Sequence, residues 1–330
     1  MRSADFRYLS ILDELQYLPT LSLSDRALHD SIKKSIETIG KSFSKALLHN
    51  MCLFYGLSQN ELLTNYDLFE RSLYRILGKA GEPIIRLIKA EMLTYAIMNG
   101  SEITVADIMD PNLTASYVLK DIRDREVFDF VRNISQCEHI ALLYRSETTK
   151  NKIFSEFFNH CQTEGDDCEK QPPIGLISIK RPSKLRADLL HISYDELLNE
   201  TRRDKVKEKL AAWIAYVHSF NKWQHFPTRI AEEDATMWLK NGFSAHNNLH
   251  LEQLFSTLTC DINMSMLCTF DISKIEGTDT NTMLKSIIST HDYVIFDEPL
   301  IVYRKAIRRT NTKYNYNYLE KIAQRRERSE

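Results

Sequence analysis

Polar residues able to bind a small molecule follow short apolar runs, each long enough to form one buried strand. The clearest run covers residues 264–270 and ends on the carboxylate of Asp271. A second run, residues 139–144, is followed directly by Arg145. Because the carboxyl ends of parallel strands meet at one edge of a sheet, residues in these positions are expected to share a site.

The candidate residues at these strand ends divide by the chemistry that they offer. Arginine and lysine favour an anionic group, carboxylates accept hydrogen bonds, and a tryptophan supplies an apolar or stacking wall. A metal held by Glu233 and Asp271 is a less favoured alternative to hydrogen bonding. The predicted ligand-binding residues are Tyr144, Arg145, Ser146, Lys180, Arg181, Glu233, Trp238 and Asp271.

No motif of a known catalytic centre accompanies these residues. Gly40-Lys41-Ser42 matches the end of a phosphate-binding loop, but Ser35 stands where that motif needs its first glycine. The surrounding pattern is that of an amphipathic helix rather than a strand followed by a loop. A glycine-rich dinucleotide turn and a nucleophile elbow are also missing. We therefore expect neither catalytic residues nor enzyme activity.

Two groups of histidine and cysteine are weak candidates for a metal site. His246 and His250 stand four residues apart, but the residue after His246 is not the glutamate that a zinc hydrolase requires. His160, Cys161 and Cys168 supply only three ligands, and their spacing fits no common zinc motif. We therefore expect no metal and no other cofactor.

From residue 137 onward, apolar runs alternate with stretches of helical spacing, which is typical of βαβ units. The predicted strands are 139–144, 174–179, 189–194, 228–231, 264–270 and 293–296, and the clearest helices are 203–220 and 249–258. This pattern predicts a parallel sheet covered by helices. The chain has 9 glycines in 330 residues, fewer than the usual share of about 7%, and none cluster into a phosphate-binding turn.

The first hundred residues show helical spacing throughout. Apolar residues from Leu28 to Leu47 recur three and four positions apart, which predicts one amphipathic helix. Ser58 and Glu61 have the spacing of a capping box, and Gly78 suits a helix end. Residues 118–134 predict a further, connecting helix.

The composition indicates a folded chain without a membrane span. Apolar residues make up 43% and charged residues 27% of the sequence, and no segment has low complexity. No apolar stretch reaches the roughly 18 residues of a membrane helix, and acidic residues interrupt the first 18 positions, unlike a signal peptide. Six cysteines form no CxxC pair. We therefore expect a cytoplasmic protein with reduced thiols.

Three segments are candidates for contact with a macromolecule. Residues 304–330 carry nine Lys or Arg against three Glu, and their tyrosines would allow weak DNA contact through phosphate binding and stacking. The alternative for this tail is a solvated terminus. The helical region is a second candidate for DNA contact. The apolar stripe Phe6, Leu9, Leu12 and Leu15 would suit pairing of two copies in a homodimer.

The second half of the chain resembles the MEDS family, a sensory domain named for methanogens, methylotrophs and a dichloromethane-responsive regulator. The similarity lies in the order and spacing of five segments within about residues 137–304. These are His139-Ile-Ala-Leu-Leu-Tyr144, Phe226-Pro-Thr-Arg-Ile-Ala-Glu-Glu233 followed by Trp238, Leu251-Glu252, Leu267-Cys-Thr-Phe-Asp271 and His291-Asp-Tyr-Val-Ile295. One loop departs from the family pattern, because residues 161–173 are acidic and end in two prolines where a glycine-containing turn is usual.

This resemblance implies a ligand-sensing domain related to the RecA-like and clock-ATPase fold, without ATPase activity. Such domains are thought to sense small organic molecules and to pass the signal to an attached domain. Residues 27–97 are similar to a helical output domain described from ammonia-oxidising archaea, through segments 43–48, 55–57 and 73–78. Together the two similarities imply an archaeal one-component regulator with the output domain first and the sensor second.

We therefore predict a mostly parallel α/β sensor domain preceded by an all-α domain. The predicted boundaries are 1–100 for the helical output domain, 101–136 for a helical connector, 137–304 for the sensor and 305–330 for the basic tail. The predicted function is non-enzymatic sensing of a small organic ligand. Two alternatives stay open: a nucleotide-binding, degenerate relative of RecA-like ATPases, and a DNA-binding transcriptional regulator.

Overall fold

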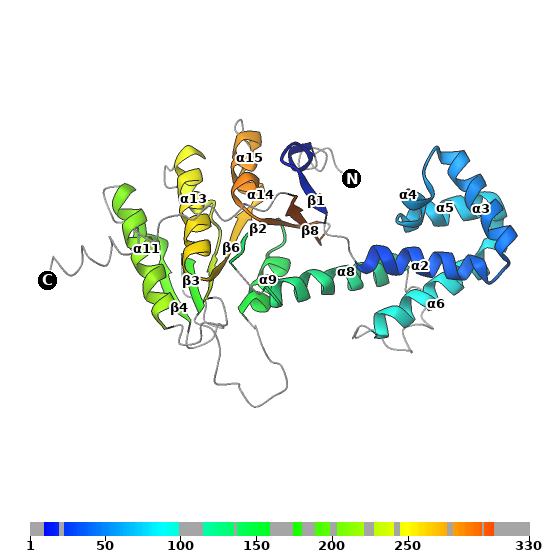
Figure 1. The fold of residues 1–330 in the computed structure, drawn as a ribbon, viewed down its shortest axis with the longest axis horizontal. Helices are drawn as coiled ribbons and strands as arrows, with labels where there is room; N and C mark the ends of the chain where they lie inside the picture. Colours follow the sequence, from blue (N-terminus) through cyan, green and yellow to red (C-terminus); the bar gives the residue numbers. More distant parts are fainter. Residues whose placement is uncertain are drawn as a thin grey trace, which may run out of the picture. The chain divides into compact units, whose positions relative to one another are not determined.

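The computed structural model divides the chain into two compact units, each with an apolar core of its own (Figure 1). The helical unit is Leu21–Val127, and the sheet unit combines Met1–Thr20 with Phe128–Glu330. The structure describes residues 10–19, 23–98, 115–134, 137–158, 174–179, 189–198, 203–220, 228–240, 245–275, 280–298 and 300–306.

Every regular element described in the helical unit is a helix. The elements are α2 (Leu23–Glu37), α3 (Lys41–Tyr55), α4 (Gln59–Leu63), α5 (Tyr66–Leu77), η1 (Gly78–Gly81), α6 (Glu82–Met98) and the first part of α8 (Ala115–Arg132). Their apolar faces form one core that includes Ile32, Met51, Phe69, Ile88 and Met92. The helical character predicted for this part of the chain is therefore confirmed.

The single helix predicted from Leu28 to Leu47 is wrong, because the structure has two helices there. Gly40 separates α2 from α3 with a φ of 134°, a backbone conformation that only glycine adopts readily. The break turns Ile39 and Phe43 outward, where they are 46% and 39% exposed. Gly40 also belongs to the sequence that resembles a phosphate loop, and it connects two helices instead of following a strand.

Local capping signals in the helical unit are confirmed. The Ser58 amide donates to Glu61 Oε2 at 2.8 Å, and the Glu61 amide donates to Ser58 Oγ at 3.3 Å, which is a reciprocal capping box at the start of α4. Helix α5 ends at Gly78, whose φ of 57° suits a glycine. The N-cap of α5 is Asn65, whose side chain accepts a hydrogen bond from the Leu68 amide at 3.1 Å.

The described part of the sheet unit contains an eight-stranded sheet in the order β1-β8-β7-β2-β6-β5-β3-β4. The strands are β1 (Tyr17–Pro19), β2 (His139–Tyr144), β3 (Ile174–Ser178), β4 (Leu190–Ser193), β5 (Thr228–Glu232), β6 (Met264–Asp271), β7 (Tyr293–Asp297) and β8 (Leu300–Lys305). Pairing is parallel from β7 through to β4, and antiparallel for β8 with β7 and with β1. The six predicted strands and the mostly parallel sheet are confirmed.

Helices cover both faces of this sheet (Figure 1). Its helices are α9 (Glu147–Phe158), α10 (Tyr194–Leu198), α11 (Arg203–Ser219), α12 (Met237–Lys240), α13 (Ala245–Asp261), α14 (Ile272–Ile275) and α15 (Thr280–Thr290). The larger helices α11, α13 and α15 lie together on one face, whereas α9 lies on the other. Strands buried on both faces explain why the sequence shows continuous apolar runs. None of the described helices has the length and apolarity needed to cross a bilayer.

The predicted boundary of the helical domain at residue 1 is wrong, because residues 10–19 belong to the sheet unit. Strand β1 pairs with β8, and the hydroxyl of the buried Tyr17 donates to the carbonyls of Ile288 and His291. Leu12 is buried in the core of the sheet unit, so it cannot form part of the predicted homodimer stripe. Phe6 and Leu9 of that stripe lie outside the described residues.

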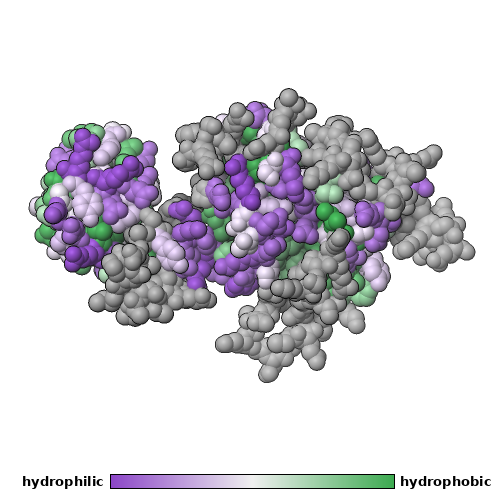
Figure 2. Space-filling model, turned by 180° about the vertical axis from the view of Figure 1, so that it is seen from behind, coloured by the Kyte–Doolittle hydropathy of each residue, from purple (hydrophilic) through white to green (hydrophobic). Residues whose placement is uncertain are grey.

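The predicted basic tail also begins later than expected. Arg304 and Lys305 form the end of β8, a strand that the sequence did not predict. Residues 307–330 lie outside the described residues. On the face of the molecule shown in Figure 2, hydrophilic residues predominate over the described parts of the chain, and apolar residues occur in smaller groups.

The connecting helix predicted at residues 118–134 is confirmed as α8, which contributes to both units. Val118 and Ile122 belong to the core of the helical unit. At the other end, the carbonyls of Val131 and Arg132 accept hydrogen bonds from Arg229 of β5 at 3.4 and 2.9 Å. Arg229 therefore binds the carbonyl end of α8, where the helix dipole favours a cation.

Arg229 is fully buried and also reaches beyond α8. It donates to Phe157 O at the end of α9 at 2.6 Å and to Ile134 O at 2.8 Å. One guanidinium thus satisfies carbonyls at two helix ends, which a lysine ammonium cannot do because it lacks the planar set of donors. A buried charge of this kind is tolerated only when hydrogen bonds compensate it.

We predict that Arg229→Lys lowers the free energy of unfolding of the sheet unit by about 3 kcal/mol, because buried carbonyls lose charged donors. Urea unfolding followed by tryptophan fluorescence measures this unit selectively, since Trp213, Trp223 and Trp238 all lie in it. Arg304→Lys, at an exposed position of β8, is the matched control and should leave the unfolding midpoint unchanged. Equal midpoints for the Arg229 variant and the wild type would contradict this role.

Candidate functional site

The sheet has a topological switch point between β2 and β6. These strands are parallel neighbours, but the chain leaves β2 into α9 on one face and leaves β6 toward α15 on the other face (Figure 1). Connections that diverge in this way leave a crevice beyond the carboxyl ends of the two strands. The last residues of the two strands, Tyr144 and Asp271, stand opposite each other in the register.

Tyr144 is the most informative residue at this point. Its side chain is 1% exposed, and its hydroxyl is buried without a hydrogen-bond partner among the described residues. Burial, followed by the nearby carboxylates of Asp234, Glu147 and Asp271, raises the pKa of Tyr144 well above its ordinary value. The hydroxyl therefore keeps its proton at neutral pH. It is a buried donor in a place where folding alone does not require one.

Two ammonium groups near Tyr144 each bridge a pair of carboxylates. Lys150 Nζ lies 2.6 Å from Glu147 Oε2 and 3.0 Å from Glu233 Oε1, and it stands 5.3 Å from the centre of the Tyr144 ring. Burial disfavours the charged form of Lys150, but its hydrogen bonds to both carboxylates outweigh burial and raise its pKa. This side chain is 5% exposed, so the pair with Glu233 is held largely away from water.

Lys274 makes the equivalent bridge on the other side. Its Nζ lies 2.7 Å from Asp234 Oδ2 and 2.8 Å from Asp271 Oδ2. Burial alone would raise the pKa of Asp271, but the hydrogen bonds from Lys274 and Ser273 outweigh it and lower that pKa. Asp271 is therefore ionised at neutral pH, as expected for a hydrogen-bond acceptor.

The backbone at Asp234 is held in a left-handed conformation with φ of 56°. Its amide donates to Thr269 Oγ1 at 2.9 Å, and the next amide, of Ala235, donates to Thr269 O at 2.7 Å. These bonds join the turn after β5 to strand β6. A non-glycine residue in this region stores strain, and such strain occurs often at functional sites.

The turn after β2 is closed by a carboxylate from a third strand. The backbone amides of Arg145 and Ser146 donate to Asp297 Oδ2 at 2.7 and 2.6 Å. In nucleotide-binding folds, amides at the turn after a strand bind phosphate. Here a carboxylate already occupies these two donors, so the described turn is a poor phosphate site.

The structure brings together three of the predicted ligand residues, Tyr144, Glu233 and Asp271. Ser146 is half-buried, and its hydroxyl accepts a hydrogen bond from the Thr149 amide at 3.3 Å, as a cap of α9. The Arg145 side chain is exposed. Predicted residues Lys180 and Arg181 lie outside the described residues, as do His160, Cys161, Cys168 and the side chains of His246 and His250.

Trp238, predicted as a wall of the ligand site, has a structural partner in a buried carboxylate. Its side chain is fully buried in the core of the sheet unit, where its Nε1 donates to Glu232 Oε1. The ring meets Tyr194 edge to face at 5.1 Å between centroids. The hydroxyl of Tyr194 donates to the same Glu232 Oε1 at 3.2 Å and to Glu233 O at 2.9 Å. Trp238 therefore holds a buried carboxylate.

Sequence reasoning missed the two lysines and three of the carboxylates at this edge, Glu147, Asp234 and Asp297. Asp297 is the first polar residue after a predicted strand, so the rule that selected Asp271 also applies to it. Lys150 and Lys274 lie on helices α9 and α14, and only the fold shows that these helices start beside the strand ends.

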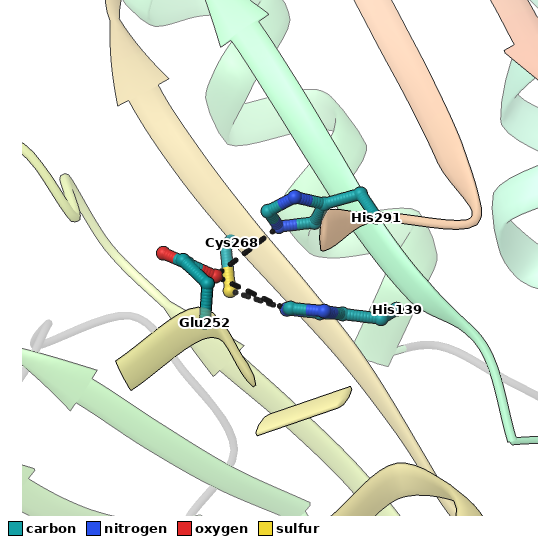
Figure 3. Close-up of side chains that lie close together, drawn as sticks. All are labelled: His139, Glu252, Cys268 and His291. Atoms are coloured by element: carbon teal, nitrogen blue, oxygen red, sulfur yellow. Dashed lines mark hydrogen bonds and ion pairs between the residues drawn. The ribbon is translucent and has the colours of Figure 1, made fainter. Parts of the chain in front are cut away.

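A second polar cluster is buried between the sheet and α13, and Figure 3 shows its four side chains. His139 starts β2, Cys268 is in β6, His291 lies two residues before β7, and Glu252 comes from α13. Glu252 Oε2 lies 3.3 Å from His139 Nε2 and 3.4 Å from His291 Nε2. Cys268 Sγ lies 3.3 Å from His139 Nε2. All four residues are at most 1% exposed.

The buried cluster is not arranged for nucleophilic catalysis. A cysteine beside a histidine is reactive when the thiolate forms and substrate can reach it. Burial, followed by the charges of Glu252 and Glu232, raises the pKa of the Cys268 thiol well above its ordinary value. Burial also raises the pKa of Glu252. In the absence of a cation, these groups therefore favour their neutral forms.

No sequence motif could have identified this cluster, because its members are at positions 139, 252, 268 and 291. Metal motifs read from sequence depend on ligands a few residues apart. The only signal available was that each residue falls within a segment that carries the MEDS resemblance.

No protein-family model matches the chain, and no curated protein shows significant similarity to it. The resemblance to the MEDS family and to an archaeal output domain therefore stays a prediction. The site is interpreted from its own geometry.

We predict that Tyr144→Phe raises the free energy of unfolding of the ligand-free protein by about 1 kcal/mol, since it removes a buried hydroxyl without a hydrogen-bond partner among the described residues. Tyr194→Phe is the matched comparison, because its hydroxyl makes two hydrogen bonds. That variant should lower the free energy of unfolding by about 1 kcal/mol or more. Urea unfolding measures both. Destabilisation of equal size in the two variants would mean that Tyr144 has a structural partner.

Proposed function

We propose that this chain is a non-enzymatic sensory protein that binds a small organic molecule at the carboxyl ends of β2 and β6 and signals through its helical unit. The observation that carries the proposal is the buried hydroxyl of Tyr144, which lies at the switch point without a partner among the described residues. A binding site needs a few placed polar groups that folding leaves available. Tyr144 is such a group.

The charges around Tyr144 support a neutral or cationic ligand. Among the described residues, carboxylates outnumber ammonium groups here: Glu147, Glu233, Asp234 and Asp271 lie around Lys150 and Lys274. The phenol donates a hydrogen bond, so its complement is an acceptor such as a hydroxyl, carbonyl or amide oxygen. The anionic ligand expected from Arg145 is less well supported, since that side chain is exposed. We therefore propose a small uncharged or amine-bearing polar molecule.

Nucleotide binding is less well supported than small-molecule binding. The parallel sheet is compatible with the predicted relationship to RecA-like proteins, which stays part of the proposal. The described turn after β2, however, presents its two amides to Asp297 instead of to a phosphate. Phosphoryl groups need such amides together with a nearby lysine and a metal ion, and the carboxylates at this edge would repel them.

The helical unit is proposed to act through a protein partner. Of the thirteen large apolar residues exposed among the described residues, ten lie in this unit, including Leu53 at 68% and Met98 at 81%. Exposed apolar groups favour protein contacts. Residues 21–127 carry 13 Lys or Arg against 14 Asp or Glu, so the unit lacks the basic charge that DNA binding requires. The cytoplasmic location and the contact of the tail with DNA stay predictions.

Ligand binding is tested by measuring the melting temperature of the full chain in the presence of small alcohols, amides, amines, carboxylates and nucleotides. Native mass spectrometry of freshly purified protein guides the choice of compounds, because it shows the mass of any copurified ligand. We predict that an uncharged or amine-bearing compound raises the melting temperature, because only the folded site binds it. The shift should disappear in Tyr144→Phe and in the double variant Asp271→Asn with Arg145→Gln.

The control is Arg304→Gln, which changes an exposed arginine outside this site and should keep the full shift. Micromolar binding of ATP with magnesium, measured by calorimetry, would favour the nucleotide-binding alternative. An undiminished shift in both site variants would place the ligand elsewhere.

A further inference from the structure

We infer that His139, Glu252, Cys268 and His291 form a binding site for a divalent transition metal, with Zn²⁺ as the preferred ion. Their ligand atoms all lie within 4.8 Å of one another. Ligands at normal zinc distances, about 2.0–2.3 Å, stand roughly 3.3–3.7 Å apart in a tetrahedron. The separations of 3.3, 3.3 and 3.4 Å within this cluster fall in or at the edge of that range.

The hydrogen bonds of His139 orient its Nε2 lone pair toward the cluster. Ser256 Oγ donates its single proton to Thr290 O at 2.7 Å. It can therefore only accept from His139 Nδ1, which lies 2.9 Å away. Nδ1 carries the proton, so Nε2 of the neutral ring is an acceptor that faces Glu252 and Cys268.

His291 has the same tautomer for an independent reason. Its Nδ1 lies 2.5 Å from Ile287 O, a carbonyl that can only accept a hydrogen bond. The proton therefore lies on Nδ1, and Nε2 presents its lone pair to Glu252 Oε2. Metal-binding histidines commonly donate their second ring nitrogen to a carbonyl or a similar acceptor in this way.

Lone pairs from all four side chains thus meet at one buried point (Figure 3). The His139 and His291 rings lie with their centroids 3.9 Å apart and their planes inclined by 31°. Two arrangements suit these acceptors: protons on Glu252 and Cys268, or one metal ion between the four side chains. A divalent ion with one thiolate and one carboxylate gives a site of zero net charge, which suits full burial.

The donor set favours Zn²⁺ among the available metals. Thiolate and imidazole are ligands for zinc, copper and iron, whereas magnesium and calcium prefer oxygen. A zinc site with four protein ligands and no open coordination position is typically structural and not catalytic. Such an ion would join β2, β6 and the start of β7 to α13, and it would be acquired during folding because the cluster is buried.

The test is metal analysis of the full chain, refolded from urea in Zn²⁺ or in EDTA. We expect about one zinc per chain and a higher melting temperature after refolding with Zn²⁺. Replacement by Co²⁺ should give the visible absorption of a tetrahedral cobalt site with a thiolate ligand. Glu252→Gln and Cys268→Ser should abolish stoichiometric binding, and Cys137→Ser, outside the cluster, should retain it.

Variants of buried ligands can fail to fold, so Ser256→Ala provides a milder test. It removes a hydrogen bond to His139 without touching a ligand, and it should weaken zinc affinity about tenfold or more. The inference is overturned if the wild-type chain refolds to the same melting temperature in EDTA and in Zn²⁺ and holds less than about 0.1 metal ions per chain. The four side chains would then be joined by hydrogen bonds, with protons on Glu252 and Cys268 in place of a metal ion. This result is independent of ligand binding at Tyr144.

Discussion

The parallel pairing of β2 with β6 is the constraint on which both polar regions of the sheet unit depend. Its register places Tyr144 opposite Asp271 at the carboxyl end and Ala141 beside Cys268 in the middle of the strand. Side chains alternate between faces, so a shift of one residue would turn every side chain of a strand to the other face. Tyr144 would then leave the switch point, and Cys268 would leave the side of the sheet that α13 covers.

Buried polar groups in this unit are compensated to different extents. Arg229 has hydrogen bonds to helix carbonyls, and Glu232 Oε1 accepts from Tyr194 and Trp238, whereas Glu232 Oε2 is buried without a hydrogen-bond partner among the described residues. The Tyr144 hydroxyl and the Glu252 carboxylate have no hydrogen-bond partner among the described residues. An unmatched buried polar group costs stability. Tyr144 differs from Glu232 because its only polar side-chain atom lacks a hydrogen bond among the described residues, and we interpret it as a ligand-binding group.

Much of the fold could be predicted from the sequence, because strands buried on both faces leave a continuous apolar signal. The same signal was too weak for β1 and β8, which are edge or antiparallel strands with polar residues such as Arg304 and Lys305. The helix break at Gly40 was missed, because apolar periodicity continues across it. For the candidate site, the rule of strand ends found Tyr144, Glu233 and Asp271. The hydrogen bond from the Trp238 indole to Glu232 could not be predicted from the sequence. Residues brought together only by tertiary packing, such as Lys150 and His291, leave no local pattern.

We propose that the carboxyl ends of β2 and β6 form a site that a bound small molecule completes. A crystal structure of the full chain bound to a compound that raises its melting temperature tests this claim most directly. We expect density for the compound within hydrogen-bonding distance of the Tyr144 hydroxyl, between Lys150 and Lys274. A Tyr144 hydroxyl bonded to a protein group, with the compound bound elsewhere, would contradict it.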